Sequence, residues 1–212
     1  MNILWIMLAG VVAYLIGAIP TAVWYGQYFH ATDVRKYGSG NAGATNTFRV
    51  LGKKAGSIVL LIDAFKGWAA ASLANLLLIQ EFIIPVHLLY FQLLYGIIAV
   101  LGHIFPIYVG FKGGKGVATL LGMVLAIYLQ VALLSLAVFI IVLVVSHYVS
   151  LSSMTASLAF PLLMFIPFFR PENNTLIIVG FILCGLVIWT HRRNIQRLLN
   201  GNEGKIYLFG KK

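Results

Sequence analysis

Long apolar segments without a formal charge constrain this chain more than any other feature. Residues 3–26, 82–111 and 117–169 contain no Lys, Arg, Asp or Glu. Hydrophobic residues make up 61% of the 212-residue chain and charged residues only 9%, which leaves too few polar groups to cover a water-facing surface. Since about 20 apolar residues span a bilayer, the sequence predicts an all-α integral membrane protein.

The spacing of the polar breaks predicts seven transmembrane helices. These breaks fall at 27–56, 79–83, 110–116, 146–153, 170–174 and 191–212. The segment 117–169 has 53 residues, roughly 80 Å of helix, which is too long for one crossing of about 30 Å and long enough for three short ones. We expect its turns near 128–130 and within 146–153. The part 117–147 is short for two spans, so a re-entrant hairpin stays open as an alternative.

The basic residues predict the orientation of the chain. With seven crossings and a cytoplasmic first break, 14 of the 15 Lys and Arg lie on or near the cytoplasmic side, and only Arg170 lies beyond it. The N-terminus is then outside, and the C-terminal tail with Lys211 and Lys212 is inside. We expect one membrane-embedded domain over 1–212. The net charge of +10 then reflects membrane topology, and we expect no nucleic acid partner.

Three separated polar segments are predicted to reach the same membrane face: GSGNAGATN at 38–46, FKGGKG at 111–116 and HRRN at 191–194. Glycine lets successive backbone N–H groups turn toward one anion, and Ser, Thr and Asn add donors beside the Lys and Arg counter-charges. Each segment alone is also typical of an ordinary loop or of a basic membrane anchor. Together they favour a site for a phosphate monoester or an acyl phosphate.

The FKGGKG segment is not a nucleotide-binding P-loop, because its glycine spacing is one residue short and it ends in Gly rather than Ser or Thr. Instead Lys115 precedes the next predicted span, where the helix N-terminus also favours an anion.

Several ionisable residues fall inside or at the ends of the predicted spans. Asp63 and Lys66, three residues apart, could form a structural pair or take part in chemistry, and we expect Lys66 to extend back to the inner face. His103 and His191 could act as acid, base or polar cap. Asn194, three residues later, strengthens the case for a functional role of His191, because the two side chains share one face if the helix continues.

Other chemistries lack their residues. Five acidic residues and no HExxH or paired-Cys spacing disfavour a protein-held metal centre, and we expect no metal and no cofactor. The HxxxxD pattern of one large acyltransferase class is absent.

The longer motifs resemble one family closely. GSGNAGATN, Arg49, LGKKAG, LIDAFKG at 61–67, GHIFPIYVGFKGGKGVAT at 102–119 and HRRNIQRLLNG at 191–201 resemble the bacterial acyl-phosphate:glycerol-3-phosphate acyltransferases. The resemblance implies seven spans in the bacterial inner membrane and an active site at the cytoplasmic face. It also implies that the enzyme transfers a fatty acyl group from acyl phosphate to the 1-hydroxyl of glycerol 3-phosphate, giving lysophosphatidic acid for phospholipid synthesis.

The resemblance also implies the site residues. Ser39, Lys115, His191 and Asn194 would be catalytic. The substrate-binding residues would be Gly38, Gly40, Asn41, Ala42, Gly43, Thr45, Asn46, Arg49, Lys53, Gly113 and Gly114. The implied partners are the two substrates and membrane lipid, and a monomer is one candidate for the working state. Some family members carry an acid where Arg193 stands, so the role of Arg193 stays open, as do the acyl chain length and the oligomeric state.

Two other classes fit the same polar segments. A transporter of organic phosphates would need polar groups near the bilayer midplane and internal repeats, whereas the charges here gather at one face. A lipid-phosphate phosphatase would release phosphate without needing an acceptor.

Overall fold

The computed structural model describes residues 2–207, and helices are the regular elements of that part of the chain. The α-helices are α1 (Ile3–Ala18), α2 (Thr21–His30), α3 (Ala44–Ile79), α4 (Leu88–Ile104), α5 (Val117–Ile127), α6 (Leu129–Ser146), α7 (Val149–Leu163), α8 (Thr175–Thr190) and α9 (Arg192–Leu199). The short 3₁₀ turns are η1 (Val34–Lys36), η2 (Pro85–His87), η3 (Ile107–Val109) and η4 (Pro167–Phe169). The all-α prediction is therefore confirmed for residues 2–207. Lys211 and Lys212 of the predicted inner tail lie outside this range.

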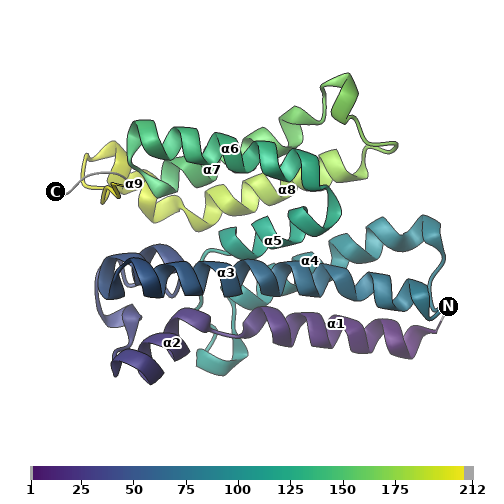
Figure 1. Cartoon of the computed structure of the whole chain (residues 1–212), viewed down its shortest axis with the longest axis horizontal. Helices are drawn as coiled ribbons and strands as arrows, with labels where there is room; N and C mark the ends of the chain where they lie inside the picture. Colours follow the sequence, from purple (N-terminus) through teal and green to yellow (C-terminus); the bar gives the residue numbers. More distant parts are fainter. Residues whose placement is uncertain (1, 208–212) are drawn as a thin grey trace. The chain divides into compact units, whose positions relative to one another are not determined.

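The described residues form two compact units, one within Met1–Ile127 and one within Tyr128–Lys212. In the first unit, α3 packs against α1, α2, α4 and α5, and α1 packs along α4 (Figure 1). In the second unit, α7 packs against both α6 and α8, and α9 follows α8 (Figure 1). The expectation of one domain over 1–212 stays a prediction.

Small residues fill the interior of the first unit. Its core cluster contains four alanines from three helices, together with Leu77, Ile83 and Tyr95. Large apolar side chains such as Leu61 and Phe65 of α3 instead point outward, 68% and 63% exposed. Small residues let helices approach closely, and apolar side chains on the outside suit contact with lipid. This arrangement fits the membrane location that the composition predicts.

The lengths of the helices bear on the number of spans. Three helical segments of residues 2–207 are long and apolar enough to cross a membrane, and the bent pairs α1–α2 and α8–α9 raise that number to five. The bends are 45° and 61°. The apolar helices α5 and α7 are shorter, and adding these two to five would give seven. The count of seven and the positions of the termini stay predictions.

Most of the expected breaks agree with the structure, part of one does not, and one further break was not expected. The turns expected in 117–169 are confirmed at Tyr128 and at 147–148. The apolar segment 3–26 is not one helix, because Pro20 has no N–H to donate and α1 ends before it. Residues 44–56, expected within a polar break, already belong to α3, which departs from helical geometry at Gly52.

Candidate active site

The glycine-rich loop between η1 and α3 is held in place by one side chain. The Asn46 amide oxygen accepts hydrogen bonds from the Ser39 backbone N–H (2.8 Å) and from the Ser39 hydroxyl (3.1 Å). Its amide nitrogen donates to the carbonyls of Val34 (2.7 Å) and Tyr37 (3.1 Å). Asn46 is 1% exposed. Its observed contacts thus fix the loop, and its predicted contact with substrate stays a prediction.

Two glycines let this loop turn so tightly. Gly38 and Gly40 have φ of 60° and 72°, a region that costs residues with a Cβ roughly 1–2 kcal/mol. A Cβ on Gly38 would also overlap the Asn46 amide oxygen. The next glycine, Gly43, is the residue before α3 and accepts from the N–H groups of Asn46 and Thr47 at 3.1 Å. The loop from 38 to 43 therefore leads directly into the first turn of α3.

Arg35 connects the turn before the glycine-rich loop to the segment before the second motif. The Arg35 guanidinium donates to the Asp33 carboxylate at 2.9 Å and to the Val109 carbonyl at 3.4 Å. The side-chain hydrogen bond from Arg35 is the largest cause that holds the pKa of Asp33 below its ordinary value of 3.8, so the pair is ionised at neutral pH. The segments that precede the first two motifs are therefore linked within the first unit.

The second motif is a loop whose backbone lies against the end of α4. The N–H groups of Gly113 and Gly114 donate to the carbonyls of Ile104 and His103 at 3.2 and 3.1 Å. Lys115 follows, half-buried, two residues before α5 begins at Val117. The predicted position of Lys115 just ahead of a helix N-terminus is thus confirmed.

The remaining predicted residues of the first unit divide between loop and helix. Asn41 and Ala42 lie in the loop before α3. Thr45, Arg49 and Lys53 lie on α3, and Lys53 is exposed beside the departure from helical geometry at Gly52. Thr45 and Arg49, four residues apart, therefore lie on the same face of α3.

In the second unit, His191 stands at the bend between α8 and α9. Its Nδ1 is 2.8 Å from the Val187 carbonyl, and its backbone carbonyl accepts from the Asn194 N–H at 2.8 Å. Both side chains are buried, at 2% and 4% exposure. His191 and Asn194 are thus neighbours across one turn. Their convergence with the first two motifs stays a prediction.

A carboxylate that sequence reasoning missed holds Asn194. The Glu203 carboxylate accepts from Asn194 Nδ2 (2.7 Å), Ser150 Oγ (2.9 Å) and Arg197 Nε (2.8 Å). Burial opposes ionisation of Glu203, but these three hydrogen bonds outweigh it and keep the pKa below its ordinary value of 4.5. The available signal was that Glu203 is the one acidic residue among the many cations of 191–212.

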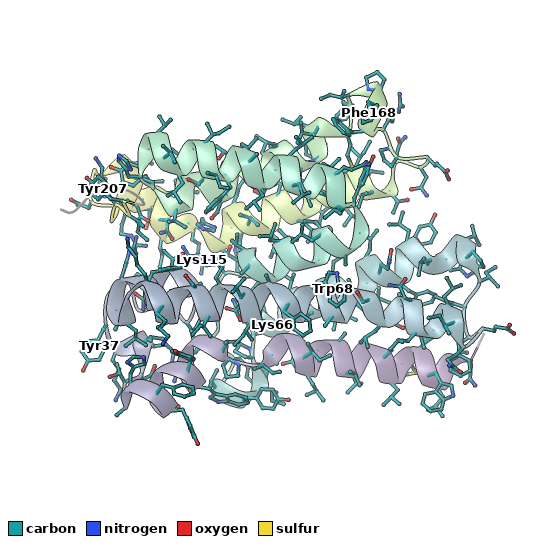
Figure 2. The ribbon with its side chains drawn as sticks, viewed as in Figure 1. Tyr37, Lys66, Trp68, Lys115, Phe168 and Tyr207 are labelled. Carbon is teal, nitrogen blue, oxygen red and sulfur yellow. The ribbon has the colours of Figure 1, made fainter. Side chains whose placement is uncertain are left out.

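The buried ionisable residues of α3 form an ion pair. Lys66 Nζ lies 2.9 Å from Asp63 Oδ1, and the two side chains are 4% and 2% exposed. The expectation that Lys66 extends to the inner face is wrong, because the Asp63 carboxylate and the Ile19 carbonyl bind its ammonium group inside the helix bundle of the first unit (Figure 2).

The apolar helices and the glycine loop with its flanking cations define a class: a membrane protein whose polar loops are suited to binding an anionic ligand. A sequence model of the family described as glycerol-3-phosphate acyltransferase matches residues 7–201. Glycerol-3-phosphate acyltransferases of Listeria welshimeri and Geobacillus kaustophilus are 44% and 46% identical to this chain. These two matches cover 95% and 94% of this chain and 96% and 95% of the relatives.

Two solved structures are similar as well. The integral membrane glycerol 3-phosphate acyltransferase PlsY (YgiH) in its glycerol 3-phosphate form matches with a TM-score of 0.80 and 36% identity over 95% of both chains. Its lysophosphatidic acid form matches with a TM-score of 0.78 and 35% identity. This chain therefore belongs to the glycerol-3-phosphate acyltransferase family, as its motifs suggested, and it is a membrane acyltransferase.

Proposed function

We propose that the chain transfers a fatty acyl group from acyl phosphate to the 1-hydroxyl of glycerol 3-phosphate, at the cytoplasmic face of a bacterial inner membrane. The relative PlsY is described in forms with glycerol 3-phosphate and with lysophosphatidic acid, which are an acceptor and a product of such a transfer. The acyl-phosphate donor is the expectation from the motifs.

The observation that carries the proposal is the loop 38–43, fixed by Asn46 and linked through Arg35 to the segment before Lys115. Preorganised N–H groups and a cation can stabilise charge on a phosphate without reorganising during the reaction. In the proposal, the loop binds the donor phosphate, and the Ser39 hydroxyl turns from Asn46 to donate to that phosphate. Lys115 offsets the charge of the phosphate as it leaves, and Arg49 with Lys53 or Lys54 binds the acceptor phosphate.

The transfer step needs only positioning and one proton acceptor, because an acyl phosphate is already activated. The acceptor hydroxyl oxygen attacks the acyl carbonyl carbon, the bond from that carbon to the phosphate oxygen breaks, and inorganic phosphate leaves. The hydroxyl proton passes to His191 or to the phosphate of the acceptor itself.

Product formation by purified protein in detergent tests the proposal. The substrates are acyl phosphate and glycerol 3-phosphate, and we expect lysophosphatidic acid and phosphate in equal amounts. Ser39→Ala and Lys115→Ala should each lower the rate by about 10²–10³-fold, the usual cost of removing one such donor. Wild-type turnover in either variant would remove that residue from the proposed chemistry.

The same assay separates the alternatives. A transporter would give no product in detergent, where no sealed compartment exists, and would move phosphate esters only in vesicles. A phosphatase would release phosphate at the same rate with and without glycerol 3-phosphate. Either result would contradict the proposed transfer.

A further inference from the structure

A buried polar cluster lies beneath the second motif, within the first unit. Its centre is Asp63 Oδ1, which accepts from Lys66 Nζ and from Thr21 Oγ1, each at 2.9 Å. The His103 Nδ1 atom lies 3.7 Å from the same oxygen. Asp63, Lys66 and His103 are 1%, 3% and 7% exposed, so the cluster is closed to solvent.

One end of the cluster binds the break between α1 and α2. Lys66 Nζ donates to the Ile19 carbonyl at 2.9 Å, and the Val23 N–H, which would reach this carbonyl in a continuous helix, donates to Pro20 instead. The Ile19 carbonyl also accepts from the Thr21 N–H at 3.0 Å, so the Lys66 ammonium is a second donor to this carbonyl at the break. Lys66, on α3, therefore lies next to the break between α1 and α2 (Figure 2).

The other end of the cluster touches the loop that carries Lys115. The His103 carbonyl accepts from the Gly114 N–H at 3.1 Å. A Cβ built on Gly114 would overlap His103 Nε2, and the nearest atoms around that Cβ all belong to the His103 ring. The imidazole is thus in direct contact with the backbone one residue before Lys115.

We propose that Asp63, Lys66 and His103 form a positioning cluster that sets the place of Lys115 through the contact between the imidazole and Gly114. This inference rests on the proposed role of Lys115. Buried ion pairs often stabilise a fold no better than apolar residues of similar size, so three buried ionisable groups at this contact are better explained by positioning than by stability. A misplacement of about 1 Å at a reacting group can cost on the order of 10²-fold in rate.

A pair of complementary substitutions tests the contact. Gly114→Ala in the wild-type background should press on the imidazole and lower kcat by about tenfold or more. His103→Ala removes the ring and should also lower kcat. In the His103→Ala background the added methyl group has space, so Gly114→Ala should change kcat by less than about twofold. An equal loss from Gly114→Ala in both backgrounds would overturn the proposal.

A double-mutant cycle with Lys115→Ala tests whether the cluster acts through that residue. If it does, His103→Ala should change the residual kcat of Lys115→Ala by less than about twofold. If the two losses multiply, the cluster does not act through Lys115. Should His103→Ala fail to fold, Gly114→Ala replaces it in the same cycle, with the same two outcomes.

Controls separate this proposal from general destabilisation and from the proposed function. Gln92→Leu removes another polar contact between α3 and α4, the 3.4 Å hydrogen bond to Asn75, and should leave kcat of the folded protein unchanged. Full activity of Lys115→Ala would contradict the proposed site itself. An inactive Lys115→Ala together with full kcat in His103→Ala and Gly114→Ala would contradict only the positioning cluster.

Discussion

The Nδ1 nitrogen of His191 is bound inside the protein. Its Nδ1 is 2.8 Å from the Val187 carbonyl, and a carbonyl oxygen only accepts, so Nδ1 carries the hydrogen in this contact. In the neutral ring Nε2 is then the acceptor nitrogen. That tautomer suits a base for the attacking hydroxyl, and the fixed ring orientation reduces the cost of positioning it.

Replacing His191 distinguishes the two proton acceptors of the proposed reaction. If Nε2 takes the hydroxyl proton, His191→Ala should lower kcat by about 10²–10⁴-fold. The measurement is kcat in the detergent assay, with His30→Ala on the exposed end of α2 as the control histidine. Substantial activity in His191→Ala would instead assign the proton to the acceptor phosphate.

Between elements, the contact of α3 with α5 depends on glycine. A Cβ on Gly122 would overlap the Ala64 carbonyl, and one on Gly67 would overlap the Thr119 carbonyl. The two helices therefore approach backbone to backbone, and α5 begins just after Lys115. Any side chain at these glycines must push α5 away from α3.

Gly122→Ala should destabilise the protein by about 1–3 kcal/mol, the usual cost of overpacking, and lower activity through α5. Thermal unfolding in detergent measures the first effect. Gly185→Ala in α8 is the matched control, since no atom lies within 4 Å of a Cβ built there. That control should be neutral or stabilised by up to about 1 kcal/mol, because Ala favours helix over Gly. Equal unfolding temperatures of the two variants would contradict the close contact.

The segment after α9 folds back within the second unit. The Ile206 N–H donates to the His147 carbonyl at 2.8 Å, and Glu203 binds residues of α7 and α9. The segment therefore joins the turn between α6 and α7 to the helix that holds Asn194. Its one carboxylate makes this junction sensitive to acid.

Glu203 should contribute stability that disappears at low pH. Its folded-state pKa is below 4.5, so the contribution is fully present above pH 4.5 and is lost as pH falls through the lower folded value. Glu203→Gln should cost about 1.5–3 kcal/mol at pH 7, the range for a hydrogen bond to a charged group. Unfolding temperatures measured at several pH values should show the gap between wild type and variant closing in acid. A gap independent of pH would contradict this assignment.

For the molecule as a whole, the distribution of charges and the outward-facing apolar side chains both indicate a membrane protein. The orientation of the chain across the membrane is the property to measure. The predicted topology places 80–81 and 170–174 outside and 110–116 and the tail inside. The chain has one cysteine, Cys184, which is buried. A Cys184→Ser background therefore permits single-cysteine labelling with an impermeant reagent.

In this background, the single variants Gln80→Cys and Asn173→Cys should react in intact cells. The single variants Lys112→Cys and Asn200→Cys should react only after the membrane is opened. The Cys184→Ser protein without an added cysteine is the control and should remain unlabelled. Labelling of the Asn173→Cys and Asn200→Cys variants from the same side would contradict the predicted last crossing.

Local patterns predicted much of this protein, because they depend on residues close together in sequence. Hydrophobic length predicted the helices and the turns at 128 and 147–148. Glycines and neighbouring cations marked the loops at 38–43 and 111–116. The helical state of 44–56 was missed, since its polar residues look like a loop when the packing partners of α3 are unknown.

Composition and the spacing of polar breaks are enough to specify a helical membrane protein with anion-suited polar loops, because they settle which segments can leave water. The contacts by which Asn46 fixes Ser39, Glu203 holds Asn194 and Asp63 keeps Lys66 buried follow from helix packing instead. Such contacts join groups whose distance in space depends on how the helices pack. A polar side chain takes the partner that packing brings within hydrogen-bond distance, and the order of residues does not specify that partner.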